Sequence, residues 1–181
     1  MALIVSIAYD TERNLGRAYR EIIERLKPED DCCFLDHDAI WTTRDWYQQI
    51  QEAIKRYPNA GLFGAVTNRI GNKDQVVTGA PTGHDMAAHR RFGLELQAKH
   101  GSNATDVTDG RMLSGVVLCI PAAARAAGFR ISDGFFGVDN AMHREARRLG
   151  RRVYLLRGLY VQHWYRGAGE KHVNAPKARL S

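Results

Sequence analysis

The chain alternates between two hydrophobic periods. Short apolar runs of strand composition lie at residues 3–8, 32–35, 61–66, 115–120, 153–156 and 159–161. Between them, apolar positions recur at the 3.6-residue period of a helix. These helices are predicted to begin after Asn14, at Thr42 or Thr43, at Asp85, after Pro121 and at about Asp139. Strands that alternate with helices predict an α/β domain with a mixed, mainly parallel sheet flanked by helices.

Two predicted loops interrupt this alternation. Residues 67–84 are rich in Gly, Asn, Thr and Pro, and residues 128–137 are rich in Gly and Phe. Long loops in a compact domain are usually functional or mobile. No linker composition is visible, so we expect one domain over residues 1–181, ending in a basic tail at about residues 164–181.

Composition narrows the class of protein. The 181 residues are 44% hydrophobic and 25% charged, as expected for an ordinary folded protein. No apolar run reaches the roughly 18 to 20 residues of a membrane span, and the first run stops at Asp10 without signal-peptide features. Cys32, Cys33 and Cys119 lie in apolar runs without metal-site spacing. Reduced, buried thiols in a cytoplasmic protein are therefore expected.

The positive charge is concentrated near the C-terminus. The net charge is +6, but residues 144–181 carry ten basic and two acidic side chains. Of the 26 cations in the chain, 20 are Arg, whose planar fork suits phosphate or carboxylate groups. This distribution predicts an anionic partner.

Asp36-His37-Asp38 is the sharpest chemical feature, since it follows the apolar run 32–35 directly. Ligands of open α/β sheets bind at the carboxyl ends of strands. Side chains two apart on an extended backbone share a face, so both carboxylates can bind one ligand. Two such oxygens suit Mg²⁺ or Mn²⁺, which can bridge nucleotide phosphates. The competing interpretation is that one Asp only caps the next turn.

Four segments in order resemble GT-A-fold glycosyltransferases of the family 2 type. Phe34-Leu-Asp-His-Asp-Ala-Ile-Trp-Thr-Thr resembles the D-x-D segment of that family, and Leu113-Ser-Gly-Val-Val-Leu-Cys-Ile resembles the strand before its acceptor site. Gly128-Phe129, Gly134-Phe-Phe-Gly-Val-Asp-Asn140, Arg144 and Leu149-Gly150 resemble its G-E-D stretch. The apolar run that ends in His163 resembles the strand whose terminal His completes the metal site.

This resemblance implies a fold, an activity and a set of site residues. The fold would be GT-A-like, and the activity would be metal-dependent transfer of a sugar from a nucleoside-diphosphate donor to a hydroxyl acceptor, with inversion. Asp36 and Asp38 would bind the donor through its ribose and its metal-bound diphosphate. Asp36, Asp38 and His163 would hold Mn²⁺ or Mg²⁺, and Asp139 would be the catalytic base. Helix capping is the competing interpretation for Asp139, and a core or surface histidine for His163.

Six further residues are predicted to contact the donor. Tyr9 and Asp10 match the place where the family contacts the nucleotide base. Asn68 and Arg69 end a predicted strand and open the long loop, although an ordinary turn is an alternative. Arg166 and Lys171 follow His163 and are predicted diphosphate contacts.

Two other hypotheses remain open. The chain is alternatively a nucleic-acid-binding protein that uses its basic C-terminal segment, or a glycosyltransferase whose acceptor is modified DNA. It is also alternatively a catalytically inactive relative. Only one helix fits between Asp10 and Asp36, where the family has a whole βα unit, and Val138 stands in place of the Glu of its G-E-D stretch. The sugar, the acceptor and the oligomeric state stay open.

Overall fold

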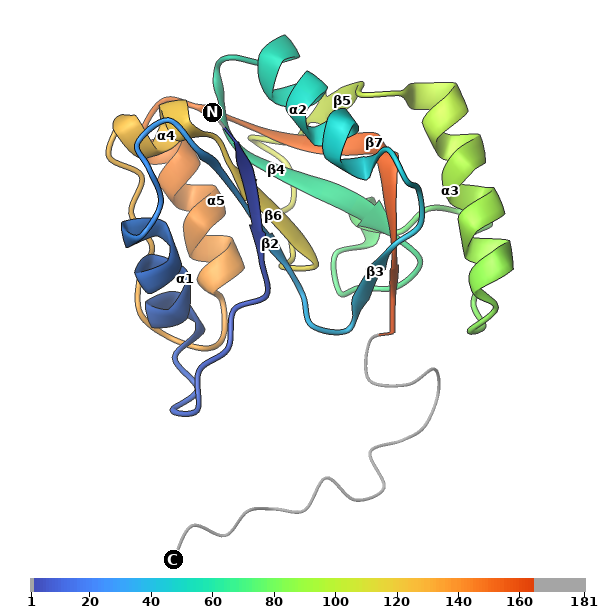
Figure 1. The fold of residues 1–181 in the computed structure, drawn as a ribbon, viewed down its shortest axis with the longest axis horizontal. Helices are drawn as coiled ribbons and strands as arrows, with labels where there is room; N and C mark the ends of the chain where they lie inside the picture. The colour runs from blue at the N-terminus through green and yellow to red at the C-terminus, as the bar shows by residue number, and fades with distance from the viewer. Residues whose placement is uncertain (1, 165–181) are drawn as a thin grey trace, which may run out of the picture.

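The described residues form an α/β fold around an open, mixed seven-stranded sheet (Figure 1). The computed structural model describes residues 2–164. The strands are β1 (Leu3–Ser6), β2 (Asp31–Leu35), β3 (Ala39–Trp41), β4 (Ala60–Thr67), β5 (Ala104–Asp106), β6 (Val117–Ile120) and β7 (Arg152–His163). Their order is β1-β2-β6-β4-β7-β3, and β5 pairs with β7.

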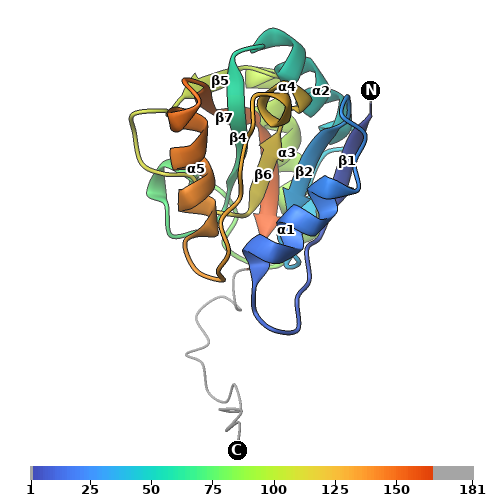
Figure 2. The ribbon, with the colours of Figure 1, turned by 90° about the vertical axis from the view of Figure 1, so that its left-hand side faces the viewer.

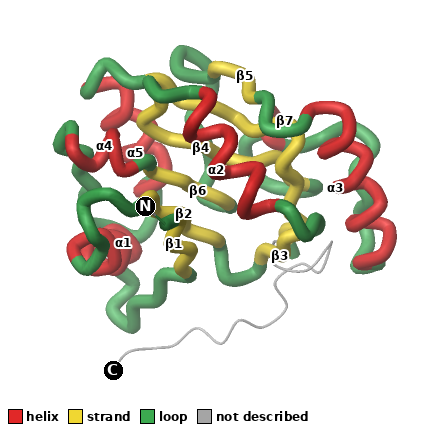
Figure 3. Tube along the Cα trace, turned by 45° about the horizontal axis from the view of Figure 1, so that its top comes forward, coloured by secondary structure: helices red, strands yellow, loops and turns green. Residues whose placement is uncertain are grey.

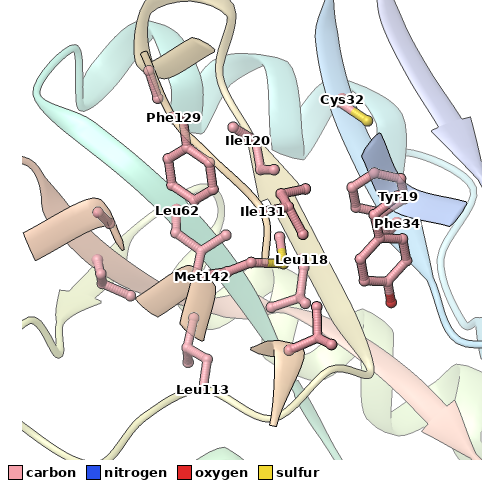
Figure 4. Close-up of a cluster of buried hydrophobic side chains, with 14 of the residues drawn as sticks. Tyr19, Cys32, Phe34, Leu62, Leu113, Leu118, Ile120, Phe129, Ile131 and Met142 are labelled. Carbon is pink, nitrogen blue, oxygen red and sulfur yellow. The ribbon is translucent and has the colours of Figure 1, made fainter. Parts of the chain in front are cut away.

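Helices cover both faces of this sheet. They are α1 (Leu15–Glu24), α2 (Trp46–Arg56), α3 (Met86–His100), α4 (Ala122–Ala126) and α5 (Val138–Arg148). Figure 2 shows α1, α4 and α5 in front of the strands, and Figure 3 shows α2 lying over the opposite face. Successive residues of β2 enter different cores because side chains alternate across a strand. Phe34 packs in the core under α1 and α5 (Figure 4). Leu35 packs in the core under α2.

The directions of the strands place several strand ends together. β1 is parallel to β2, β6 is antiparallel to both β2 and β4, and β4 is parallel to β7. The carboxyl ends of β1, β2, β4 and β7 therefore lie on one edge of the sheet, at the bottom in Figure 1. We call this the carboxyl edge. α1 begins on this edge, since it follows β1. α5 also begins here, since it runs to the opposite edge, where β7 starts.

The predicted elements agree with the structure except in the pairing and in short strands. Asn14 and Asp85 cap α1 and α3 through their side chains, at the predicted starts of these two helices. Within residues 2–164, two strand pairs are parallel and four are antiparallel, so the expectation of mainly parallel pairing was wrong. The helix expected at Thr42 or Thr43 begins at Trp46, because β3 and a turn occupy the preceding residues. None of the helices in residues 2–164 has the length and apolar character of a membrane span.

Strand β7 is one long strand with a bulge in place of the two short strands that we expected. Its partners in β4 advance normally to Ala65, which pairs with Leu156, but the next β4 residue, Val66, pairs with Tyr160. Residues 157–159 are thus extra on the β7 side. Gly158 lies in this bulge, where an added Cβ would stand 2.1 Å from the carbonyl oxygen of Gly101. Gln49 donates to the carbonyl groups of both glycines at 3.2 and 3.0 Å, so the two segments are held together.

Replacing Gly158 by alanine is expected to destabilise the fold by about 2 to 3 kcal/mol, because the methyl group meets backbone that cannot turn away. In a domain of this size that loss lowers the melting temperature by roughly 4 to 12 °C. Thermal unfolding of Gly158→Ala measures it. Gly71→Ala is the matched control, since nothing lies within 4 Å of a Cβ there. Equal melting temperatures of the two variants would contradict the close contact.

His143 is a fully buried polar side chain of α5 that bonds backbone on both sides. Its Nδ1 accepts from the Leu113 N–H at 3.2 Å, so its Nε2–H donates to the Thr108 carbonyl at 3.1 Å. These two bonds use the neutral imidazole. Burial lowers the pKa of His143, and the cations Arg147 and Arg144 lower it further, while the Thr108 contact acts in the opposite direction.

The lowered pKa of His143 predicts a stability that falls in mild acid. As the pH falls, His143 takes up a proton in the unfolded chain at about pH 6.5, before it does so in the folded chain. The contribution of His143 to the free energy of unfolding is therefore complete above that pH and is lost as the pH falls below it. Urea unfolding at several pH values from about 7.5 down to 5 is the measurement. His143→Gln keeps an acceptor and a donor without the titration, and we expect a flatter pH dependence. An identical pH dependence in both proteins would rule out His143 as its source.

A candidate metal centre at the carboxyl edge

Asp36 and Asp38 lie in the turn that joins β2 to β3. The Asp36 N–H donates to the Val116 carbonyl at 3.0 Å, and the Ala39 N–H donates back to the Asp36 carbonyl at 3.1 Å, which closes the turn. Both carboxylates are half-buried. The alternative role of capping applies only to the Asp36 side chain, whose Oδ1 accepts from the His37 N–H at 3.1 Å.

His163, the last residue of β7, reaches both carboxylates. Its Cα partner in the sheet is Ala39, directly after Asp38, so the pairing of β3 with β7 brings the two segments together. The distance from His163 Nε2 to Asp38 Oδ1 is 3.0 Å and to Asp36 Oδ2 is 3.6 Å. The His163 side chain is 4% exposed, against 42% for Asp36 and 21% for Asp38. Three predicted side chains from two separate segments, the β2–β3 turn and the end of β7, thus converge at one place.

The second ring nitrogen of His163 fixes its protonation. Nδ1 lies 2.8 Å from the Arg69 carbonyl oxygen, which can only accept, so Nδ1 carries a hydrogen. A neutral ring then presents its Nε2 lone pair to two carboxylates, an arrangement that needs a proton or a cation between them. Histidine ligands of metals commonly donate their other N–H to a carbonyl in this way.

The pKa values express the same need for positive charge. Burial lowers the pKa of His163, but its contacts with Asp36, the Arg69 carbonyl and Asp38 outweigh burial and raise it overall. Burial raises the pKa of Asp36, but its contacts with His163 and His37 lower it overall. Both shifts favour a protonated His163 beside the two carboxylates, or a cation in place of that proton.

The donor set fits a divalent cation. Ligands at adjacent positions of an octahedral ion, with bonds of about 2.1 Å, stand about 3 Å apart, close to the spacing of His163 and Asp38. Two carboxylates with one imidazole suit Mn²⁺, which accepts nitrogen as well as oxygen ligands. Sequence reasoning missed His37. Its ligand atoms lie within 4.8 Å of those of Asp36 and Asp38, although its side chain is 79% exposed.

Asp139 lies near this centre, on the first turn of α5. A Cβ built at Gly115 would be 3.7 Å from the Asp139 Cβ, and Gly115 precedes Val116, which binds the Asp36 backbone. The N-cap of α5 is Gly137 in a left-handed conformation, with φ of 74°, so Asp139 is not the cap that the alternative interpretation required. Its Oδ1 accepts from the adjacent Asn140 N–H at 2.8 Å.

The loop before α5 is anchored to α1. The Gly16 N–H donates to the Gly134 carbonyl at 2.9 Å, and the Gly134 N–H donates to Asn14 Oδ1 at 3.0 Å. An added Cβ at Gly16 would stand 1.9 Å from the Ser132 carbonyl oxygen. Glycine at this position therefore lets the loop approach the start of α1 and fixes the start of α5.

The predicted donor contacts have different surroundings. Tyr9, just beyond β1, is 83% exposed and available to a ligand. The Asp10 carboxylate is held by the guanidinium of Arg17, with contacts of 2.9 and 3.0 Å. Asn68 Oδ1 accepts from the His163 N–H at 2.8 Å, so Asn68 holds the end of β7. Arg69 Nη2 donates to the Thr82 carbonyl at 3.0 Å, so Arg69 holds the loop 67–84. Arg166 and Lys171 lie outside the described residues.

Exposed apolar side chains gather around the carboxyl edge. Seven large hydrophobic residues are exposed within residues 2–164. Six of them lie near a strand end or the start of α5 on this edge: Ile7, Tyr9, Ile40, Phe135, Phe136 and Trp164. Phe135 and Phe136 sit in the loop just before α5 and contact each other edge to face. Trp164 stacks on His84, with ring centroids 3.8 Å apart. Trp164 directly follows His163, and Phe135 and Phe136 shortly precede Asp139, so exposed aromatic rings lie on the same edge of the sheet as the candidate centre.

Several basic residues of the α5 region are paired with acids. Arg148 contacts Glu145 at 2.7 Å, Arg147 contacts Asp109 at 3.3 Å, and Arg152 contacts Asp106 at 3.5 Å. Part of the positive charge that suggested nucleic-acid binding is thus neutralised locally.

Known protein families and curated proteins were compared with the chain. No model of a known protein family matches the chain, and no curated protein matches it. The resemblance to GT-A glycosyltransferases accordingly stays a prediction.

Proposed function

We propose that this protein is a metal-dependent glycosyltransferase that moves a sugar from a nucleoside-diphosphate donor to a hydroxyl group of an acceptor, with inversion. The observation that carries the proposal is the convergence of Asp36, Asp38 and His163 at the carboxyl edge, with His163 Nδ1 tied to a backbone carbonyl. Such a centre at strand ends is the expected place for a nucleotide ligand in an α/β sheet.

In this proposal Asp36, Asp38 and His163 hold Mn²⁺ or Mg²⁺. The bound cation would neutralise the diphosphate as it departs. Asp139 takes the proton from the acceptor hydroxyl as that oxygen forms a bond to the anomeric carbon, and the bond from this carbon to the diphosphate oxygen breaks with its electron pair on the diphosphate. The exposed aromatic rings at the carboxyl edge would supply stacking surfaces for the base or the acceptor.

The experiment is a thermal-shift screen of UDP, GDP, ADP, CDP and dTDP with and without Mn²⁺, followed by transfer or hydrolysis assays with the matching nucleotide-sugars. A ligand at a hundred times its Kd stabilises the folded state by about 2.7 kcal/mol, or roughly 5 to 10 °C in a domain of this size. We expect one diphosphate to give this shift only with the metal. If no diphosphate binds with Mn²⁺ or Mg²⁺ and no donor is turned over, the proposal is wrong.

A further inference from the structure

Tyr19 is a buried aromatic residue of α1 whose hydroxyl points toward the carboxyl edge. Its side chain is 6% exposed and stacks on Phe34, with ring centroids 4.0 Å apart. Figure 4 shows the hydroxyl oxygen directed away from Cys32, along the direction in which β2 runs toward Asp36. Stacking thus fixes the ring, and the direction of the ring fixes the position of the hydroxyl.

The Tyr19 hydroxyl lies near two carboxylates but is bonded to neither. Burial raises the pKa of Tyr19, and the negative charges of Asp36 and Asp139 raise it further, which places both carboxylates within electrostatic range. Among residues 2–164 the hydroxyl has no hydrogen bond, and it is not among the buried polar atoms without a partner, so it is accessible from outside. A hydroxyl held in this way is free to donate to a ligand.

The surroundings define the chemical group that fits there. A phosphate oxygen would accept from Tyr19 but has no hydrogen to donate to the Asp139 carboxylate, which holds no cation in the proposed function. A sugar hydroxyl accepts from the Tyr19 O–H and donates its own hydrogen to a carboxylate, so it satisfies both kinds of group. Discrimination of this type is strong when a site is built to bond a hydroxyl, because the analogue without it leaves polar groups unpaired.

We infer that Tyr19 is a specificity-determining residue that binds a sugar hydroxyl of the substrate between Asp36 and Asp139. The inference rests on the proposed function, since it requires a ligand with a ribose or a transferred sugar. Tyr19 contributes through its hydroxyl, and its ring only positions that group against Phe34.

The test compares wild type with Tyr19→Phe, which keeps the stacked ring. Calorimetry would give the Kd of UDP, GDP, ADP and CDP with Mn²⁺, and of their 2′-deoxy and 3′-deoxy forms. For wild type we expect one deoxy form to bind about tenfold more weakly, and for Tyr19→Phe we expect the ribose form to lose about tenfold while the deoxy form is unchanged. If ribose makes no difference, nucleotide-sugars with a deoxy sugar form the second arm, with the same expected pattern.

Tyr154→Phe is the matched control. Tyr154 is also buried, and its hydroxyl donates to Asn59 at 3.1 Å, at the opposite edge of the sheet. We expect this variant to keep the wild-type selectivity. If Tyr19→Phe keeps the wild-type selectivity in both arms, the inference is wrong while the proposed function stands. If wild type binds no diphosphate with Mn²⁺, both are wrong.

Discussion

Replacing Asp38 by alanine is expected to reduce metal-dependent transfer by about a thousandfold, on the order of 4 kcal/mol. Asp38 makes the shortest contact with His163 Nε2, at 3.0 Å, and its side chain is 21% exposed, so it faces both the ring and the ligand side. Without it, one carboxylate and one imidazole remain, which is too few charged ligands to hold a hard cation firmly. The measurement is Mn²⁺ and diphosphate binding by calorimetry, together with the turnover of the donor.

Asp109→Ala is the matched control for this change. Asp109 is 76% exposed and contacts Arg147 and Arg152, at 3.3 and 3.8 Å, away from the carboxyl edge. We expect it to leave metal binding unchanged. Melting temperatures without metal would show that both variants fold. Wild-type binding and turnover in Asp38→Ala would remove Asp38 from the centre.

Replacing Asp139 by asparagine is expected to slow transfer by about a hundredfold to ten thousandfold while the donor still binds. Asparagine keeps the shape and the contact with the Asn140 N–H, but it cannot take up a proton. Because Asp139 lies on the first turn of α5 and packs over Gly115, its position is fixed by the helix and does not depend on its charge. Steady-state kinetics with the donor and acceptor separate kcat from KM.

Asp133→Asn is the control for this second change, since Asp133 lies in the loop just before α5. It is 62% exposed and pairs with Arg20 at 2.7 Å. We expect its transfer rate to stay close to wild type. A full transfer rate in Asp139→Asn would exclude Asp139 as the base, and loss of donor binding in the same variant would assign it to the binding site.

The sequence predicted the parts of the site that follow from local rules. Asp36 and Asp38 were expected at a strand end because an apolar run precedes them, and the start of α1 followed from the capping chemistry of the Asn14 side chain. His163 was expected at the end of a strand from the apolar run before it. All of these depend on residues within about one turn or one strand.

Other features depend on contacts between distant segments. The meeting of His163 with Asp38 requires β3 to pair with β7, and β3 has only three residues, too short to give a pattern. Tyr19 lies on the apolar face of α1, where an aromatic residue indicates a core position, and the direction of its hydroxyl follows only from its packing on Phe34. The place of β6 between β2 and β4, which accounts for two of the four antiparallel pairs, cannot be inferred from hydrophobic period alone.

The bulge in β7 also decides which side of the sheet receives the imidazole ring. Residues 157–159 are inserted between the β7 partners of Ala65 and Val66, and three is an odd number. Because side chains alternate along a strand, an odd insertion exchanges the two faces for every residue after it. If β7 continued regularly from Leu156 without the bulge, His163 would point to the face that Gln162 now occupies. The odd number of inserted residues, which lie several residues before His163, thus decides whether Asp36 and Asp38 have a histidine beside them.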